Sequence, residues 1–211
     1  LARDIQRHLF PVATPFLPGY DIAAVSEPCY EVGGDYYDFL PLRSNMMLAV
    51  ADVEGKGVSS ALVMSNLQAS LRALVMSHHS LEVIAGALNS MIREGTHAQK
   101  FISFFLGLLD TKGRKVHYIN AGHVPPLLIR SPQEVVPLET GGTVIGMFDA
   151  PAYSRGTVKL QPGDVLLLCT DGVVEAVGPD SEEYGTERMI RLVSQNRHRS
   201  AQDLVSLVRN D

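Results

Sequence analysis

Residues 31–58 read EVGGDYYDFLPLRSNMMLAVADVEGKGV, and this stretch decides the predicted fold. After the glycine pair, polar and apolar residues alternate over residues 35–40, which predicts a strand. A short polar turn leads into residues 46–51, which are apolar throughout and indicate a central strand. A glycine-bearing loop at residues 54–57 follows. We therefore expect a hairpin whose second strand opens into a loop and a helix.

The rest of the chain continues with helical and extended patterns. Helices are expected where apolar residues recur every three or four positions, at residues 1–10, 58–76, 81–93, 187–194 and 201–209. Further strands are expected at residues 21–26, 101–110, 115–120, 127–130, 135–138, 156–160 and 165–170. Because two helices follow one another between groups of strands, the order predicts an α+β fold. We expect mostly antiparallel sheets flanked by helices, and not a doubly wound parallel sheet.

The composition argues against several classes of protein. The chain has 18 lysine and arginine residues against 23 aspartate and glutamate residues, a net charge of −5, and no basic run. Nucleic acids and anionic lipids require clustered positive charge. No apolar stretch reaches the ~20 residues of a membrane span. The two cysteines, Cys29 and Cys169, lie far apart, which suits a reducing compartment. We expect a cytoplasmic protein with no nucleic-acid partner.

Three aspartates stand where predicted strands begin or end. Asp35 follows the glycine pair, Asp52 ends the apolar strand, and Asp171 ends the apolar run at residues 165–170. A buried carboxylate must be solvated, hydrogen-bonded or metal-bound. Hard cations such as Mg²⁺ and Mn²⁺ take oxygen ligands. Each aspartate alone also fits a cap or a turn, but the three together favour a metal site.

Two neighbouring residues are assigned other roles. Asp38 faces the opposite side of its strand from Asp35, so we interpret it as a structural acid. His123 lies in a glycine- and proline-bounded loop, where it either organises the loop by hydrogen bonding or contacts the site. The sequence contains no Walker loop and no nucleophile elbow.

Six stretches of the sequence resemble the SpoIIE/RsbU branch of the PPM phosphatases, relatives of protein phosphatase 2C. They occur in the order typical of that family and cover nearly the whole chain: IQ at 5–6 with LFP at 9–11, EVGGDYYDF at 31–39, ADVEGKGV at 51–58, NAGHVPP at 120–126, LQPGD at 160–164 and TDGVVEA at 170–176. The resemblance implies two stacked, mostly antiparallel sheets between helix pairs, an αββα sandwich.

The resemblance also implies a centre with two Mn²⁺ or Mg²⁺ ions. Asp52 would bridge the ions, Asp35 and the backbone carbonyl of Val53 would serve one, and Asp171 would serve the other. No side chain would act as the nucleophile, because in that chemistry a metal-activated water attacks the phosphoryl group. Lys56 is a candidate contact for the substrate, and it fits a solvated loop lysine equally well.

The resemblance divides the chain into two parts. Residues 1–11 are expected to be the end of an N-terminal linker or coiled-coil helix, and residues 12–211 the phosphatase domain. The closing strand of the family, which carries a further metal ligand, has no counterpart up to residue 211. Either the sequence lacks the end of the domain, or one metal site is weakened. An N-terminal sensor or receiver domain and a homodimer are the implied arrangement of the parent protein.

The implied function is a metal-dependent serine/threonine protein phosphatase in bacterial signalling. Its implied substrate is a phosphorylated STAS-type anti-anti-sigma protein. One alternative is a catalytically silent module that binds a phosphoprotein without hydrolysing it, consistent with the missing ligand. Another is a nucleotide cyclase, since Gly33, Gly34 and Asp35 match part of the diguanylate cyclase signature, although the match breaks at Tyr36.

Overall fold

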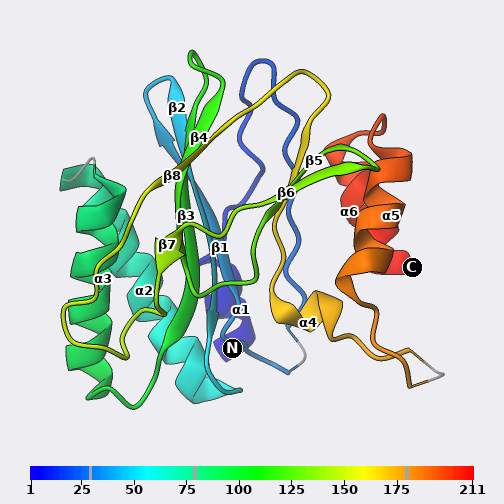
Figure 1. Cartoon of the computed structure of the whole chain (residues 1–211). Helices are drawn as coiled ribbons and strands as arrows, with labels where there is room; N and C mark the ends of the chain where they lie inside the picture. Colours follow the sequence, from blue (N-terminus) through cyan, green and yellow to red (C-terminus); the bar gives the residue numbers. More distant parts are fainter. Residues whose placement is uncertain (29, 78–79, 179–180) are drawn as a thin grey trace. The chain divides into compact units, whose positions relative to one another are not determined.

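The computed structural model describes residues 1–28, 30–77, 80–178 and 181–211 (Figure 1). The chain forms two compact units, each made of segments that are distant in sequence. The first unit consists of Leu1–Val12, Ser26–His123 and Glu139–Lys159. The second unit consists of Ala13–Val25, Val124–Leu138 and Leu160–Asp211.

The first unit is built on a six-stranded, mostly antiparallel sheet. Its strands are β1 (Tyr36–Leu42), β2 (Asn45–Val53), β3 (Ile102–Asp110), β4 (Lys115–Ala121), β7 (Gly141–Gly142) and β8 (Gly156–Lys159). The first four are neighbours in chain order, β7 pairs with β4 in parallel, and β8 pairs with β4 antiparallel. The mostly antiparallel sheet predicted from the element order is therefore confirmed.

Two long helices, α2 (Val58–Ser77) and α3 (Leu81–Thr96), cover one face of this sheet (Figure 1). Alternate residues of β2, among them Ala51 and Val53, point to this face and are completely buried. Asp52 therefore projects from the opposite face. Ser80 begins α3 by accepting a hydrogen bond from the backbone N–H of Val83.

The N-terminal helix is shorter than its apolar spacing predicts. Helix α1 is Ala2–Arg7, and the chain then turns, with the N–H of Leu9 donating to the carbonyl of Gln6. The turn places the ring of Phe10 against Tyr37, with centroids 5.3 Å apart. Packing of this aromatic residue on β1 thus ends the helix before Pro11.

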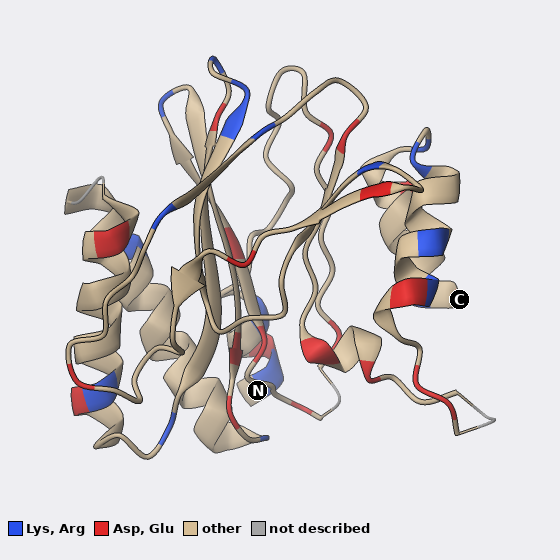
Figure 2. Cartoon of the chain, viewed as in Figure 1, with Lys and Arg blue, Asp and Glu red and all other residues tan. Residues whose placement is uncertain are grey.

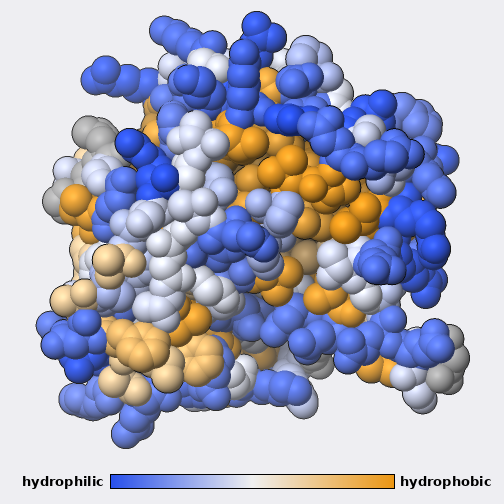
Figure 3. Space-filling view, in the orientation of Figure 1, coloured by the Kyte–Doolittle hydropathy of each residue, from blue (hydrophilic) through white to orange (hydrophobic). Residues whose placement is uncertain are grey.

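Strand β7 is two residues long and was not expected from the sequence. A Cβ atom added to Gly141 would lie 1.8 Å from the carbonyl oxygen of Asn120, so only glycine lets this segment lie against β4. The loop that follows is fixed by Asn89, which donates to the carbonyl of Phe148 (3.0 Å) and accepts from the N–H of Gly146 (2.8 Å). Figure 3 shows a small apolar patch over this loop, where Met147 and Phe148 are half exposed.

The second unit packs helices on a three-stranded sheet of order β6-β5-β9. Its strands are β5 (Leu127–Ser131), β6 (Glu134–Pro137) and β9 (Val165–Leu167), and its helices are α4 (Asp171–Val174), α5 (Thr186–Asn196) and α6 (Ala201–Asn210). The strand expected at residues 21–26 is absent, and the side chain of Asp21 accepts a hydrogen bond from the N–H of Ala201 at the start of α6. No helix in the described residues is long and apolar enough to cross a membrane.

Candidate metal centre

Two of the predicted metal ligands lie at adjacent positions at one end of the first sheet. The β1–β2 ladder ends with Tyr36 opposite Ala51. Asp35 directly precedes the first of these residues and Asp52 directly follows the second, so the antiparallel register brings them together. Both are half-buried. Figure 2 shows acidic residues gathering toward this end of the sheet and basic residues at the hairpin tips of the other end.

A serine and a histidine continue this row across the sheet. Asp52 pairs with Ser103 of β3, and the hydroxyl of Ser103 lies 2.9 Å from Nδ1 of His123. His123 is buried, and Asn120 holds its backbone twice, accepting from its N–H at 2.7 Å and donating to its carbonyl at 3.0 Å. The histidine therefore organises the loop after β4, one of the two roles expected from the sequence, at the same end of the sheet as Asp52.

The backbone carbonyl of Val53 lies against the glycine pair. A Cβ atom added to Gly34 would lie 2.7 Å from that carbonyl oxygen and 3.2 Å from Cβ of Ser60. The side chain of Val53 is completely buried in the core. The residue thus packs through its side chain, and its carbonyl oxygen faces the glycine pair.

The glycine-bearing loop after β2 is fixed by a lysine from a distant segment. Nζ of Lys100 donates to the backbone carbonyl of Glu54 at 2.9 Å and lies 3.2 Å from its carboxylate. The hydroxyl of Ser60 donates to the same carbonyl at 3.1 Å. Lys56 is exposed in this loop, and within the described part of the chain its ammonium group has no salt bridge or hydrogen bond. Its proposed contact with substrate stays a prediction.

A residue of the first helix, Gln6, holds the backbone of the glycine pair at Gly33. The side-chain amide of Gln6 donates to the carbonyl of Gly33 at 2.8 Å and accepts from its N–H at 3.1 Å. Gln6 is only 8% exposed. The backbone just before Asp35 is therefore clamped by a residue 27 positions earlier in the chain.

Replacing Gln6 with leucine should release this clamp. We expect the amide of Gly33 to exchange its proton about fivefold faster, since a hydrogen bond worth about 1 kcal/mol is lost and the local opening becomes easier. Hydrogen–deuterium exchange followed by NMR or mass spectrometry measures this. Gln99→Leu, at an exposed position, is the matched control and should leave the rate unchanged. Unchanged exchange at Gly33 in the Gln6 variant would contradict the assignment.

Replacing Gly34 with alanine should disturb the Val53 carbonyl. The added Cβ forces that oxygen to shift, and displaced ligands typically cost ten- to a hundredfold in metal affinity. We expect Mn²⁺ binding, measured by calorimetry, to weaken about tenfold. Gly86→Ala in α3 is the control, because its Cβ meets open space and helical alanine stabilises by about 0.5–1 kcal/mol. Equal Mn²⁺ affinity of both variants would refute the role given to this carbonyl.

Asp171 belongs to the second unit, where it is the exposed first residue of α4. The preceding strand is shorter than expected: β9 ends at Leu167, opposite Leu127. Its partner β5 begins there because Pro126, which has no N–H, directly precedes it.

Burial, and then the charge of Asp171, raise the pKa of the Cys169 thiol to about 11. Cys169 is a free thiol, and Cys29 lies outside the described residues.

Among residues 1–28, 30–77, 80–178 and 181–211, no group of three or more acidic, histidine or cysteine side chains forms a metal-binding cluster. The first unit offers two carboxylates at adjacent positions and one backbone carbonyl. These are the oxygen donors that Mg²⁺ and Mn²⁺ prefer. Gly34 keeps open the space beside the carbonyl. The donor set therefore fits a divalent cation, and the ligand role of Asp171 stays a prediction.

Asp38 belongs to a separate network under α2. It is 1% exposed and accepts hydrogen bonds from the hydroxyl of Tyr36 (2.6 Å) and from Nε of Arg72 (2.8 Å). Burial, followed by the negative charge of Asp38, raises the pKa of Tyr36 well above its usual range. This carboxylate thus joins β1 to α2, in agreement with its interpretation as a structural acid.

An antiparallel sheet beneath two helices, with acids at the ends of β1 and β2, defines the class of PP2C-like phosphatase folds. The SiaA-PP2C domain of Pseudomonas aeruginosa superimposes with a TM-score of 0.80 at 25% identity, over 99% of this chain and 84% of that one. The family model for Stage II sporulation protein E (SpoIIE) matches residues 43–211. The chain belongs to the SpoIIE family, and the resemblance inferred from its six motifs is confirmed.

Two curated relatives are longer than this chain. Phosphoserine phosphatase RsbU of Bacillus subtilis is 28% identical over 97% of this chain and 61% of its own length. Protein IcfG of Synechocystis is 29% identical over 92% of this chain and 35% of its own length. The chain thus spans about a third of the length of one relative and about three fifths of the length of the other.

Proposed function

We propose that this chain is the catalytic domain of a metal-dependent serine/threonine protein phosphatase. Its membership of the SpoIIE family and its likeness to phosphoserine phosphatase RsbU support the reaction class. The observation that carries the proposal is the pair of aspartates, Asp35 and Asp52, at adjacent positions beside the carbonyl of Val53. Asp171 is assigned as the further ligand.

The proposed cofactors are two Mn²⁺ or Mg²⁺ ions, held by Asp35, Asp52, the Val53 carbonyl and Asp171. Such ions lower the pKa of a water molecule and neutralise the oxygens of a phosphoryl group. The chain's own residues orient the ligands. Gln6 holds the backbone before Asp35, and Ser103 of β3 pairs with Asp52 of β2.

The negative charge of Asp35 and Asp52 determines whether a phosphate group can bind without cations. Two adjacent carboxylates repel a phosphate dianion as long as no positive charge lies between them. The nearby ammonium of Lys100 is engaged by Glu54. Lys56, exposed in the next loop, is the proposed substrate contact. We therefore infer that phosphate binding requires the cations.

The proposed substrate is a phosphoserine or phosphothreonine on a STAS-type anti-anti-sigma protein, acting in partner-switching signalling in the cytoplasm. The name of the relative RsbU, phosphoserine phosphatase, supports the phosphoserine part of this choice, and RsbU matches over 97% of this chain. The STAS-type protein and the partner-switching role are what the family resemblance implies. A sensor or receiver domain and a homodimer in the parent protein are part of the same proposal.

Phosphate release separates the proposal from its rivals. The assay uses p-nitrophenyl phosphate and a phosphoserine peptide, with Mn²⁺, with EDTA, and with Mn²⁺ restored in excess. We expect turnover with Mn²⁺, none with EDTA, and recovery afterwards. Peptide binding with no turnover at any Mn²⁺ concentration would favour the silent binding module. Turnover of a nucleoside triphosphate without phosphatase activity would favour the cyclase.

A further inference from the structure

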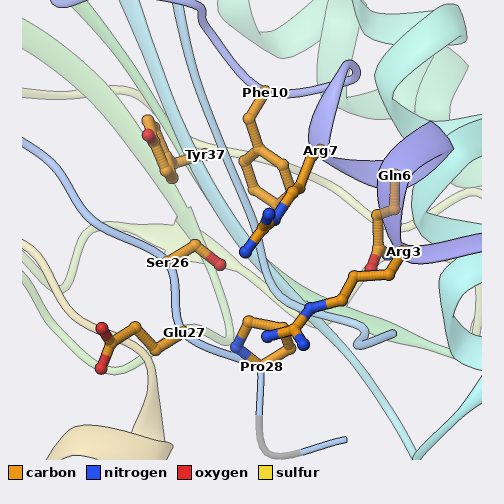
Figure 4. A pocket seen from close by; sticks show the side chains of 8 residues that line it. All are labelled: Arg3, Gln6, Arg7, Phe10, Ser26, Glu27, Pro28 and Tyr37. Carbon is orange, nitrogen blue, oxygen red and sulfur yellow. The ribbon is translucent and has the colours of Figure 1, made fainter. Parts of the chain in front are cut away.

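A cavity of about 320 Å³ opens between the first helix and the edge strand β1 of the first unit (Figure 4). Its lining comes from three segments: α1 with the turn that follows it, residues 26–28, and β1. None of its lining residues is a proposed metal ligand, although Gln6 also holds the backbone of Gly33. Its volume lies at the lower end of the range typical of small-molecule sites.

The cavity carries an excess of positive charge. Arg3 and Arg7 are four positions apart on one side of α1, and Figure 4 shows both guanidinium groups directed into the cavity. Neither forms a salt bridge or hydrogen bond to any residue of the described part of the chain. Glu27 is the single acid of the lining, and its carboxylate points away from both guanidiniums in Figure 4. The two arginines repel each other unless an anion lies between them.

The remaining walls are apolar or neutral. The rings of Phe10 and Tyr37 are tilted at 43° and form one side. Pro28 and the hydroxyl of Ser26 complete the rim. A guanidinium group binds phosphate and carboxylate through two parallel hydrogen bonds, and aromatic rings accept a flat apolar group. The walls therefore fit an anion that carries such a group.

The lining of the cavity includes the side chain that holds the backbone of the glycine pair. Gln6 lines it and at the same time grips the backbone of Gly33, two residues before Asp35. A molecule in the cavity therefore contacts the side chain that fixes this backbone. Occupancy should be detectable at Gly33 without any measurement of activity.

We propose that this cavity binds a small organic anion, a phosphate or carboxylate group carried on a flat apolar group. The guanidiniums of Arg3 and Arg7 hold the anionic end, and Phe10 and Tyr37 contact the apolar end. The site needs no metal ion, so it is independent of the proposed phosphatase reaction.

The test is a titration of the whole chain with phenylphosphonate in EDTA, followed by calorimetry and by NMR of labelled protein. We expect saturable binding, with shifts at the side-chain N–H groups of Arg3 and Arg7 and at the amide of Gly33. Benzoate replaces the phosphonate by a carboxylate and tells which anion is preferred. Inorganic phosphate lacks the ring and should bind more weakly.

Two variants and one matched control decide the outcome. Arg3→Gln combined with Arg7→Gln should weaken phenylphosphonate binding about tenfold or more, because both charged contacts are lost. Ser26→Tyr should also weaken it, by filling the cavity without changing charge. Lys112→Gln combined with Lys115→Gln removes two charges from the distant β3–β4 hairpin and should leave binding within about twofold.

Several results would overturn the site. They are the absence of saturable binding to the unchanged chain, equal weakening by the arginine and lysine pairs, and a bound state that leaves Gly33 unshifted. Because the titration contains EDTA, failure of the phosphatase proposal would not change its outcome. Phosphonate binding that persists in both the arginine and the Ser26 variants would likewise place the ligand elsewhere.

Discussion

Replacing Asp52 with asparagine is expected to lower Mn²⁺-dependent phosphate release at least about a thousandfold. Asparagine keeps the size of the side chain and one oxygen, but it removes the negative charge proposed to lie between two cations. Metal ions contribute several kcal/mol of transition-state stabilisation, and about 4 kcal/mol corresponds to a thousandfold in rate. Asp35 stands beside Asp52 but is assigned to one ion only, and Ser103 opposite carries no charge, so neither replaces the lost carboxylate.

The measurement is the initial rate of p-nitrophenyl phosphate hydrolysis over a range of Mn²⁺ concentrations. Asp149→Asn is the matched control, because Asp149 is an 86% exposed aspartate of the same unit. The control should retain the full rate. Circular dichroism should be unchanged in both variants, since Asp52 is only half-buried. An Asp52→Asn variant that keeps more than about a tenth of the rate would contradict the role of Asp52 as the central ligand.

Replacing Asp38 with alanine is expected to destabilise the first unit by about 3 kcal/mol. The change leaves the guanidinium of Arg72 and the buried hydroxyl of Tyr36 without their shared acceptor. Breaking a buried ion pair typically costs 3–5 kcal/mol. We take the lower value because Arg72 is 45% exposed and regains water.

Urea unfolding followed by far-ultraviolet circular dichroism measures this loss. Asp149→Ala removes the acid of an exposed pair with Arg93, whose closest atoms are 3.8 Å apart, and should cost less than about 0.5 kcal/mol. A loss below about 1 kcal/mol for Asp38→Ala would mean that the network does not join β1 to α2. Phosphatase activity should fall only in proportion to the unfolded fraction.

The sequence predicted the first hairpin and the acids at its open end for one physical reason. Alternation gives the strands, and the tight turn at Arg43 fixes Leu42 opposite Asn45. Once that pair is fixed, the antiparallel register between the two strands places Asp35 beside Asp52. The two-residue period of a strand then puts both side chains on the same face of the sheet. The central claim of two neighbouring carboxylates on one rim therefore follows from local pattern alone.

Contacts between distant segments could not be predicted in this way. The clamp of Gln6 on Gly33 and the bond of Lys100 to Glu54 join residues 27 and 46 positions apart. Local periodicity carries no signal for such pairs. Similarly, the segment at residues 21–26 has the composition of a strand, but Asp21 caps α6 instead. The position of Asp171 after an apolar run makes it a candidate, but no local pattern ties it to Asp52, so its role as a ligand of the same centre rests on the family resemblance.

The most direct test of the metal centre is a crystal grown with Mn²⁺, with anomalous diffraction recorded at the manganese edge. The proposal predicts two anomalous peaks about 3.5–4 Å apart. A carboxylate oxygen of Asp52 should contact both peaks, Asp35 and the Val53 carbonyl should contact one, and Asp171 the other. Peaks that are absent from this rim, or an Asp171 side chain bound to neither, would contradict it.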